Sequence, residues 1–247
     1  MFLDSIEKSL VGRLNCDAPL PGGDHAEYND TYRENGWDWP SGAPSMIGAK
    51  RMHQLRCECE RVIRERVPGD FLETGIWRGG ALIMMRAVLA AYGIKNRRAI
   101  GADSFAGLPP PTGIVPDDAA DRLLNRPEFS VSLEEVEATV ARYGLLDDQV
   151  VLLKGLFKDT LPVAPVDTLA VLRLDGDMYD STMDGLTNLY HKVSPRGSVI
   201  VDDYFLFEAQ RTAVDEYRAR NGIKDTIHKI DDFGAYWVKQ GDEEAPK

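Results

Sequence analysis

The sequence predicts a doubly wound α/β domain, in which a mostly parallel sheet carries helices on both faces and closes with an antiparallel hairpin. Strand-like and helix-like runs alternate along residues 70–220, as parallel βα units require. Two of these runs, 168–174 and 198–201, are almost continuously apolar, which is typical of strands buried on both faces. Near the carboxyl end, residues 226–230 and 235–239 flank a turn and predict the hairpin.

Residues 1–45 are predicted to form an irregular lead segment, or lid, before a domain that spans residues 46–247. Between residues 17 and 45 the segment is rich in Gly, Pro, Asp and Asn and shows no sustained period. Trp37 and Trp39 lie close together in it. These aromatic side chains indicate a segment that folds over the surface of its own domain or over a ligand.

The first half of the domain contains a helix followed by a β-α-β unit. The helix is predicted over residues 46–67, where apolar residues recur at helical spacing, and Pro68-Gly69 ends it. A strand over 70–74, a helix over 81–92 and a strand over 98–102 then form the β-α-β unit.

The second half continues the alternation. A Ser-x-x-Glu capping box that begins at Ser132 predicts a helix over 132–143, and a strand follows over 150–154. Further helices are predicted over about 182–193, between the two apolar strands, and over 211–220, before the hairpin.

Composition excludes two classes of partner. The 247-residue chain has 29 basic and 40 acidic side chains, a formal net charge of −11. A surface of this sign does not neutralise phosphates, so neither nucleic acid nor an anionic membrane is an expected partner. Its three cysteines have no spacing typical of a disulfide framework or a zinc site, and no signal peptide or membrane span is recognisable. We therefore expect a cytoplasmic protein.

The loop after the first strand predicts a nucleoside site, because ligands of open parallel sheets bind at the carboxyl ends of the strands. Its glycines follow the pattern Gly75-x-x-x-Gly79-Gly80, which is not a Walker phosphate loop. Glu73 before the turn favours a cationic group, and Asp103 at the next strand end can accept hydrogen bonds from a ribose diol. This combination suits S-adenosylmethionine. The alternative is a tight βα turn with a helix cap.

Four aspartates at two later strand ends predict a metal site. Asp175 and Asp177 follow one strand, and Asp202 and Asp203 follow the next. Four acids this close repel one another unless a cation lies among them. Ligands that are all oxygen favour Mg²⁺ ahead of Mn²⁺ or Ca²⁺. The alternative is that these aspartates cap the helices that follow the strands.

Together these residues resemble the macrocin O-methyltransferase family of the tylosin, mycinamicin and novobiocin type, whose members methylate sugar hydroxyls on natural products. The resemblance rests on an ordered set of motifs. They are Glu73-Thr74-Gly75-Ile76-Trp77-Arg78-Gly79-Gly80, Asp103-Ser104-Phe105-Ala106-Gly107-Leu108-Pro109, Lys154-Gly155-Leu156-Phe157-Lys158-Asp159-Thr160, Leu172-Arg173-Leu174-Asp175-Gly176-Asp177-Met178-Tyr179 and Val201-Asp202-Asp203-Tyr204.

The resemblance implies a class I methyltransferase fold with a Rossmann-like, seven-stranded sheet, S-adenosylmethionine as donor, and a divalent metal, usually Mg²⁺. By motif, Asp175, Asp202 and Asp203 match metal ligands and Asp177 matches the general base. The residues that match or flank the donor pocket are Ile47, Glu73, Thr74, Gly75, Trp77, Arg78, Asp103, Ser104, Phe105, Ser130, Phe157 and Lys158.

The sequence thus predicts a metal-dependent O-methyltransferase that moves a methyl group from S-adenosylmethionine to a sugar hydroxyl of a glycosylated natural product, in antibiotic tailoring. Its partner is a small-molecule glycoside, and we expect a homodimer or homotetramer. One alternative is a catechol-type methyltransferase, since a catechol is also a vicinal diol. The other is a protein that binds S-adenosylmethionine without chemistry.

Overall fold

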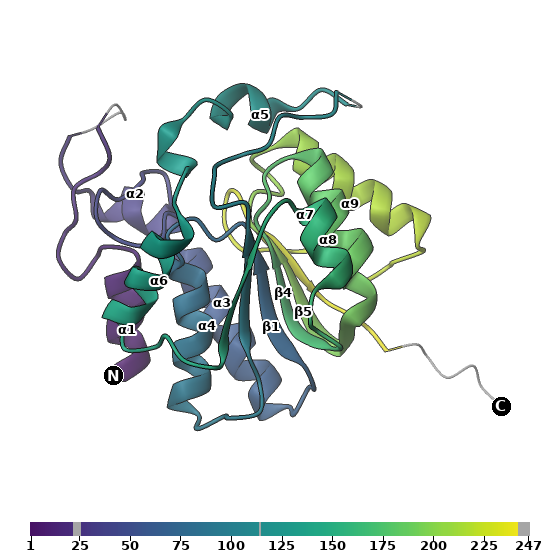
Figure 1. The fold of residues 1–247 in the computed structure, drawn as a ribbon, viewed down its shortest axis with the longest axis horizontal. Coiled ribbons are helices and arrows are strands. Elements are labelled where there is room, and N and C mark those ends of the chain that lie inside the picture. The colour runs from purple at the N-terminus through teal and green to yellow at the C-terminus, as the bar shows by residue number, and fades with distance from the viewer. Residues whose placement is uncertain (22–25, 114, 242–247) are drawn as a thin grey trace.

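The structure is a computed structural model that describes residues 1–21, 26–113 and 115–241. Within these ranges, seven strands form one sheet in the order β3-β2-β1-β4-β5-β7-β6 (Figure 1). The strands are β1 (Asp70–Thr74), β2 (Ala99–Asp103), β3 (Val150–Lys154), β4 (Leu169–Leu174), β5 (Val193–Val201), β6 (His228–Lys229) and β7 (Ala235–Val238).

The sheet has the predicted doubly wound topology with an antiparallel end. Strands β1 to β5 pair in parallel, whereas β7 pairs antiparallel to both β5 and β6. The chain winds outward from β1 through β2 to β3, then returns to the other side of β1 with β4 and β5. The order therefore reverses between β1 and β4, the position at which such sheets bind their ligands.

Helices cover both faces of the sheet (Figure 1). On one side lie α1 (Phe2–Leu10), α3 (Gly48–Arg64), α4 (Gly80–Ala91) and α6 (Leu133–Arg142). On the other lie α7 (Phe157–Thr160), α8 (Tyr179–Leu189) and α9 (Glu208–Arg220). Two short helices, α2 (Asp30–Asn35) and α5 (Asp118–Leu123), complete the set, and α5 crosses above one end of the sheet in Figure 1.

Alternation along the strands divides the apolar core into two layers. In β1, Phe71 packs in the layer with α3 and α4, and the next residue, Leu72, packs in the layer with α8. Successive side chains of a strand point to opposite faces of the sheet, so a run that is apolar at every position can fill both layers. In β4 every residue from Leu169 to Leu174 is buried.

Local signals explain where the outer helices begin. At α6 the Ser132 hydroxyl accepts a hydrogen bond from the Glu135 N–H at 3.3 Å, and the Glu135 carboxylate accepts one from the Ser132 N–H at 2.8 Å. The predicted capping box is therefore confirmed.

The structure differs from the prediction over residues 1–45, which contain α1 and α2 and are not irregular throughout. Leu3 and Leu10 of α1 are buried in the layer with α4, and this tertiary packing stabilises a helix of only nine residues. The sequence also missed α5 and α7. Residues 22–25 of the lead segment, and residues 114 and 242–247 of the predicted domain, lie outside the described ranges.

The bounds of α8 and the start of β5 also differ from the prediction, since α8 ends at Leu189 and not at residue 193. Helix α8 begins at Tyr179, three residues earlier than predicted, and β5 begins at Val193 instead of 198. The strand starts early because Val193 pairs with Leu169 before an irregularity in register, and Pro195 and Arg196 follow on the exposed side of that bend.

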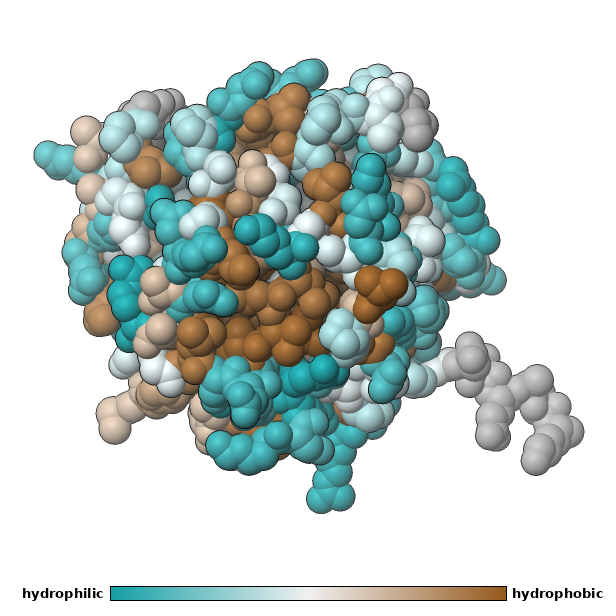
Figure 2. Space-filling view, in the orientation of Figure 1, coloured by the Kyte–Doolittle hydropathy of each residue, from teal (hydrophilic) through white to brown (hydrophobic). Residues whose placement is uncertain are grey.

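The surface carries one broad apolar area on the face that Figure 2 shows, where the sheet lies between α6 and α7 in the same view (Figure 1). Strand β3 forms that edge of the sheet, and its apolar residues 150–153 are only half-buried. In the described part of the chain, we find no helix with the length and apolar content needed to cross a membrane.

Candidate active site

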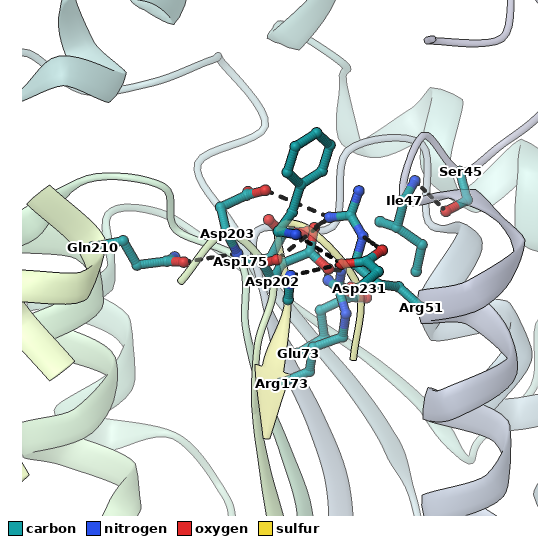
Figure 3. Close-up of polar contacts among 12 residues, drawn as sticks. Ser45, Ile47, Arg51, Glu73, Arg173, Asp175, Asp202, Asp203, Gln210 and Asp231 are labelled. Atoms are coloured by element: carbon teal, nitrogen blue, oxygen red, sulfur yellow. Dashed lines mark hydrogen bonds and ion pairs between the residues drawn. The ribbon is translucent and has the colours of Figure 1, made fainter. Parts of the chain in front are cut away.

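A cavity of about 290 Å³ opens at the carboxyl ends of the strands. Its walls come from the ends of β1, β2, β4 and β5, from the segment before α3, and from α5. The predicted ligand residues of the four strand ends meet there, as the parallel topology requires. The close-up in Figure 3 shows the polar contacts among side chains around these strand ends.

The turn after β1 brings two strand ends into contact. Gly75 has φ +76°, and a Cβ at this position would overlap the carbonyl oxygen of Asp175 at the end of β4. Glycine allows this approach because it has no side chain and adopts positive φ without steric cost. The turn therefore places the backbone after β1 directly beside the acids that follow β4.

Asp103 is held by main-chain groups of the loops around it. Its Oδ2 accepts a hydrogen bond from the Ile76 N–H at 2.8 Å, and its Oδ1 accepts one from the Phe105 N–H at 2.8 Å. Burial raises the pKa of the Asp103 carboxyl, although these hydrogen bonds oppose the rise. Asp103 also lines the cavity, where its carboxylate can accept a hydrogen bond from a ligand hydroxyl.

Glu73 offers a buried oxygen without a hydrogen-bond partner among the described residues. Its Oε1 accepts a hydrogen bond from Arg173 Nη1 at 2.5 Å, whereas Oε2 is buried without a hydrogen-bond partner. Burial raises the Glu73 pKa to about 8, against the lowering effect of Arg173. Because buried carboxylate oxygens are normally satisfied and Glu73 lines the cavity, Glu73 suits a cationic group of a ligand.

Two arginines connect the carboxylates, and we call these two side chains and their carboxylate partners the arginine network (Figure 3). Arg173 contacts Glu73, Asp175 at 2.6 Å, and Asp202. Arg51 of α3 contacts Asp202, Asp203 at 3.5 Å, and Asp231 at 3.2 Å. Both guanidinium groups are buried, with exposed fractions of 5% for Arg51 and 1% for Arg173.

Three aspartates form an acidic cluster beside this network. Asp175, Asp177 and Asp203 each offer a carboxylate oxygen, and these oxygens lie within 4.8 Å of one another. Burial raises all three pKa values, that of Asp175 to about 6, that of Asp203 to about 8, and that of Asp177 well above its usual range, with added repulsion from neighbouring carboxylates. A divalent cation bound to these oxygens would compensate both effects.

Asp202 lies differently from the other predicted metal ligands. Its two oxygens contact Arg51 and Arg173, so the structure pairs Asp202 with cations of the protein and groups Asp177 with Asp175 and Asp203. The neighbouring carboxyl group of Asp203 contributes to the raised pKa of Asp177. The assignment of Asp202 as a ligand and of Asp177 as the base stays a prediction.

Most of the predicted donor residues line the cavity. They are Ile47, Glu73, Gly75, Trp77, Asp103, Ser104, Phe157 and Lys158. Thr74, Phe105 and Ser130 are not among the lining residues, and neither is Arg78. The Arg78 guanidinium instead donates hydrogen bonds to the carbonyl oxygens of Pro40, Ser41 and Ala43, and so anchors the lead segment at the cavity rim.

The sequence missed an apolar wall of the same cavity. It consists of Trp39, Leu108, Leu123, Phe129, Leu206 and Phe207. Trp39 and Phe129 meet edge to face, with ring centroids 5.3 Å apart. The early tryptophans were the available signal for this wall, although Trp37 itself is 45% exposed and does not line the cavity.

The sequence also missed the arginine network. The available signal was Arg173, a charge within the otherwise apolar strand Leu169–Leu174, since a charge buried in a central strand requires ionic partners. Arg51 gave no such signal, because one arginine in an amphipathic helix is normally solvated.

Comparisons with known proteins support a single assignment for the whole chain. A family model described as Macrocin-O-methyltransferase (TylF) matches residues 12–239. Demethyldecarbamoylnovobiocin O-methyltransferase of Streptomyces niveus is 48% identical, covering 97% of this chain and 93% of that protein. Mycinamicin III 3''-O-methyltransferase of Micromonospora griseorubida is 44% identical, covering 96% and 95%.

Solved structures agree with this likeness. The structure of the O-methyltransferase NovP matches with a TM-score of 0.91 and 47% identity, covering 97% of this chain and 98% of that chain. The calicheamicin methyltransferase CalS11 matches with a TM-score of 0.59 and 21% identity over 80% and 82%, which shows a common fold.

Proposed function

The chain belongs to the macrocin O-methyltransferase family, and from this premise we propose that it methylates a sugar hydroxyl of a glycosylated antibiotic, with S-adenosylmethionine as donor and a divalent metal at the acidic cluster. The observation that carries the proposal is the cavity itself, where a buried acidic cluster and the predicted donor residues line one space of about 290 Å³. Residues 46–247 would form the catalytic domain and residues 1–45 a lid over it.

The donor would bind along the ends of β1 and β2. Glu73 Oε2 is buried and unpartnered, so it can accept from the ammonium group of the donor. Asp103, fixed by two main-chain N–H groups, can accept from the ribose hydroxyls. Phe157 and Lys158 at the start of α7 would complete the walls of this half of the cavity.

The acceptor hydroxyl would lie at the acidic cluster. The donor set is all oxygen, which fits Mg²⁺ ahead of Mn²⁺ or Ca²⁺. Asp175 and Asp203 would hold a divalent cation there. The third ligand would be Asp177, or Asp202 after it gives up a contact with an arginine. The cation would lower the pKa of an acceptor hydroxyl. Asp177 would receive the hydroxyl proton, because it matches the general base of the family by motif and its carboxylate lies in the same acidic cluster as Asp175 and Asp203.

The remaining space would hold the body of the acceptor. The apolar wall from Trp39 to Phe207 lies on the same cavity as the acidic cluster. It offers an apolar surface to an antibiotic aglycone while the sugar faces the carboxylates. A bare sugar would leave this wall uncovered, so we expect glycosides with an apolar aglycone to be preferred over free sugars.

The test is methyl transfer by the purified protein from S-adenosylmethionine in Mg²⁺ to a panel of antibiotic glycosides, free sugars and catechols. We expect transfer to a glycoside, loss of activity in EDTA with recovery on added Mg²⁺, and a fall in kcat of about 10²-fold or more for Asp177→Asn, the scale of lost general-base catalysis. Asp180→Asn is the matched control, because Asp180 lies on the cavity but outside the acidic cluster.

Three results would contradict separate parts of the proposal. Full activity in EDTA would contradict the proposed metal dependence. Transfer to catechols alone would contradict a sugar as the acceptor. Donor binding in calorimetry without transfer to any acceptor would favour a binding protein.

A homodimer or homotetramer is proposed for the assembly. The half-buried edge strand β3 and the broad apolar area in Figure 2 support an association of copies, because such edges are normally covered. Light scattering during size-exclusion chromatography would give the mass, and a monomer at micromolar concentration would contradict the proposal.

A further inference from the structure

Arg51 contacts the proposed metal site from helix α3, whereas the other residues of the site follow strands. It lies in the first turn of α3 and is 5% exposed. Its guanidinium contacts Asp202 and Asp203, which follow β5, and the ring of Phe233 lies 5.2 Å from it on the hairpin turn. These ion pairs join helix α3 to two adjacent aspartates of the predicted metal site.

The Nε edge of the Arg51 guanidinium also faces a carboxylate that is held in place, that of Asp231. Asp231 Oδ2 lies 3.2 Å from Arg51 Nε, an ion pair without hydrogen-bond alignment. Asp231 Oδ1 accepts hydrogen bonds from the N–H groups of Phe233 and Gly234, at 2.9 and 2.8 Å, and so is part of the hairpin turn. The guanidinium is therefore held between the hairpin and the end of β5 (Figure 3).

We propose that Arg51 is a positioning residue of the metal site, which orients the carboxylates of Asp202 and Asp203 for a divalent cation; the inference rests on the metal dependence proposed above. Two adjacent buried carboxylates repel each other and would turn apart without a fixed partner. Nη1 of Arg51 contacts oxygens of both aspartates while Nε faces Asp231, so one planar group holds carboxylates at two of its nitrogens, which a single-point cation does not. Contacts of this kind around metal ligands set the orientation of the ligands.

The charge of Arg51 alone predicts the opposite effect on metal affinity. A cation beside a metal site repels the metal, so removal of the Arg51 charge would tighten metal binding if neutralisation were its only role. If Arg51 acts by orientation, its removal weakens binding, and lysine, which keeps the charge but loses the planar fork, weakens it too. The two roles are therefore separable by one direct measurement.

The experiment measures Mn²⁺ binding by the full-length protein after treatment with EDTA and dialysis, from the electron paramagnetic resonance signal of the unbound ion, without donor or acceptor. We expect Arg51→Met and Arg51→Lys to weaken Mn²⁺ binding by about tenfold or more, the range measured for residues that orient metal ligands. Asp231→Asn should weaken it by a smaller factor, because asparagine keeps the turn hydrogen bonds at Oδ1 and loses the charge that faces Arg51.

Arg56→Met is the matched control. Arg56 lies five residues later on α3 and likewise contacts three carboxylates, those of Asp4, Glu7 and Glu60, but it does not line the cavity. We expect wild-type Mn²⁺ affinity for this variant. Circular dichroism establishes folding, and if Arg51→Met fails to fold, Arg51→Lys and Asp231→Asn decide the question.

The results separate this inference from the proposed function. Wild-type protein that binds Mn²⁺ together with Arg51 variants that bind it equally well or more tightly would overturn the positioning role and leave the metal dependence standing. A wild-type protein that binds no Mn²⁺ would overturn both.

Discussion

Arg173 illustrates how one side chain joins the two halves of the site. It is almost fully buried in the central strand β4, and its Nη1 contacts both Glu73 and Asp175. Breaking a buried ion pair by removing one partner leaves an uncompensated charge, which costs about 3–5 kcal/mol. The arginine network therefore contributes to stability as well as to the arrangement of the acids. A loss of activity in an Arg173 variant would not distinguish these two contributions.

Glu73 allows a cleaner prediction at the scale of a single residue. Its pKa is raised to about 8, so below that pH it is mostly protonated and cannot pair with the donor ammonium as a charge. The affinity for S-adenosylhomocysteine should therefore rise as the pH increases from 6 to 8. Glu73→Gln should lower the affinity at pH 8 by about 10-fold or more, the value of a charge-assisted hydrogen bond, and should flatten the pH profile.

Isothermal titration calorimetry at several pH values measures this effect. Glu137→Gln, an exposed position on α6, is the control and should keep the wild-type profile. A profile that is steep in Glu73→Gln as well would show that another group titrates.

Helix caps determine how α5 is attached above the cavity. Asp117 precedes α5, and its Oδ1 accepts a hydrogen bond from the Ala120 N–H at 3.0 Å. Its Oδ2 accepts another, also at 3.0 Å, from the N–H of Tyr179, the first residue of α8. One carboxylate thus joins the helix that carries Leu123 to the turn that carries Asp177.

Asp117→Ala should therefore weaken binding of the acceptor more than binding of the donor. Loss of both hydrogen bonds frees α5 from α8, so we expect the KM for the glycoside to rise several-fold while S-adenosylhomocysteine affinity stays near the wild-type value. Steady-state kinetics and calorimetry measure the two quantities.

Ser132→Ala is the matched control, because it removes the cap of α6, away from the cavity. It should lower the free energy of unfolding by about 0.5–2 kcal/mol, the usual value of an N-cap, and leave KM unchanged. An equal change of KM in both variants would contradict the role given to Asp117.

The whole molecule should respond to pH through its buried acids. Asp203 has its pKa raised to about 8 in the folded chain, against about 3.9 in an unfolded one. Between these values the folded state binds more protons than the unfolded state, so this group makes the metal-free protein less stable as the pH rises from about 4 to 8. A divalent cation bound at the acidic cluster would replace the protons and reverse the trend.

We therefore expect the free energy of unfolding in EDTA to be lower at pH 8 than at pH 5.5, and to rise at pH 8 when Mg²⁺ is added. With the ion at 100 times its dissociation constant, the gain is about 2.7 kcal/mol. Urea unfolding of the wild type and of Asp203→Asn measures both effects, and the variant should show a smaller dependence on pH. A wild type that is stabilised by raising the pH in EDTA would contradict this account.

The sequence determined the sheet, its closing hairpin and the edge at which the acids gather. Hydrophobic periodicity and glycine turns are local, and parallel strands place their carboxyl ends together whatever the rest of the chain does. For the same reason most of the predicted donor residues line the cavity. The short helices α1 and α5 were missed because they depend on packing against distant elements.

Only the tertiary structure decided the partner of each acid. Asp202 and Asp203 are neighbours in sequence with the same chemistry, yet one contacts both arginines and the other belongs to the acidic cluster. Arg51 of α3 contacts both of them, so their difference arises from Arg173 of the neighbouring strand β4, which contacts Asp202 and not Asp203. Strand position thus follows from local pattern, whereas the environment of a buried charge depends on which distant groups fold against it.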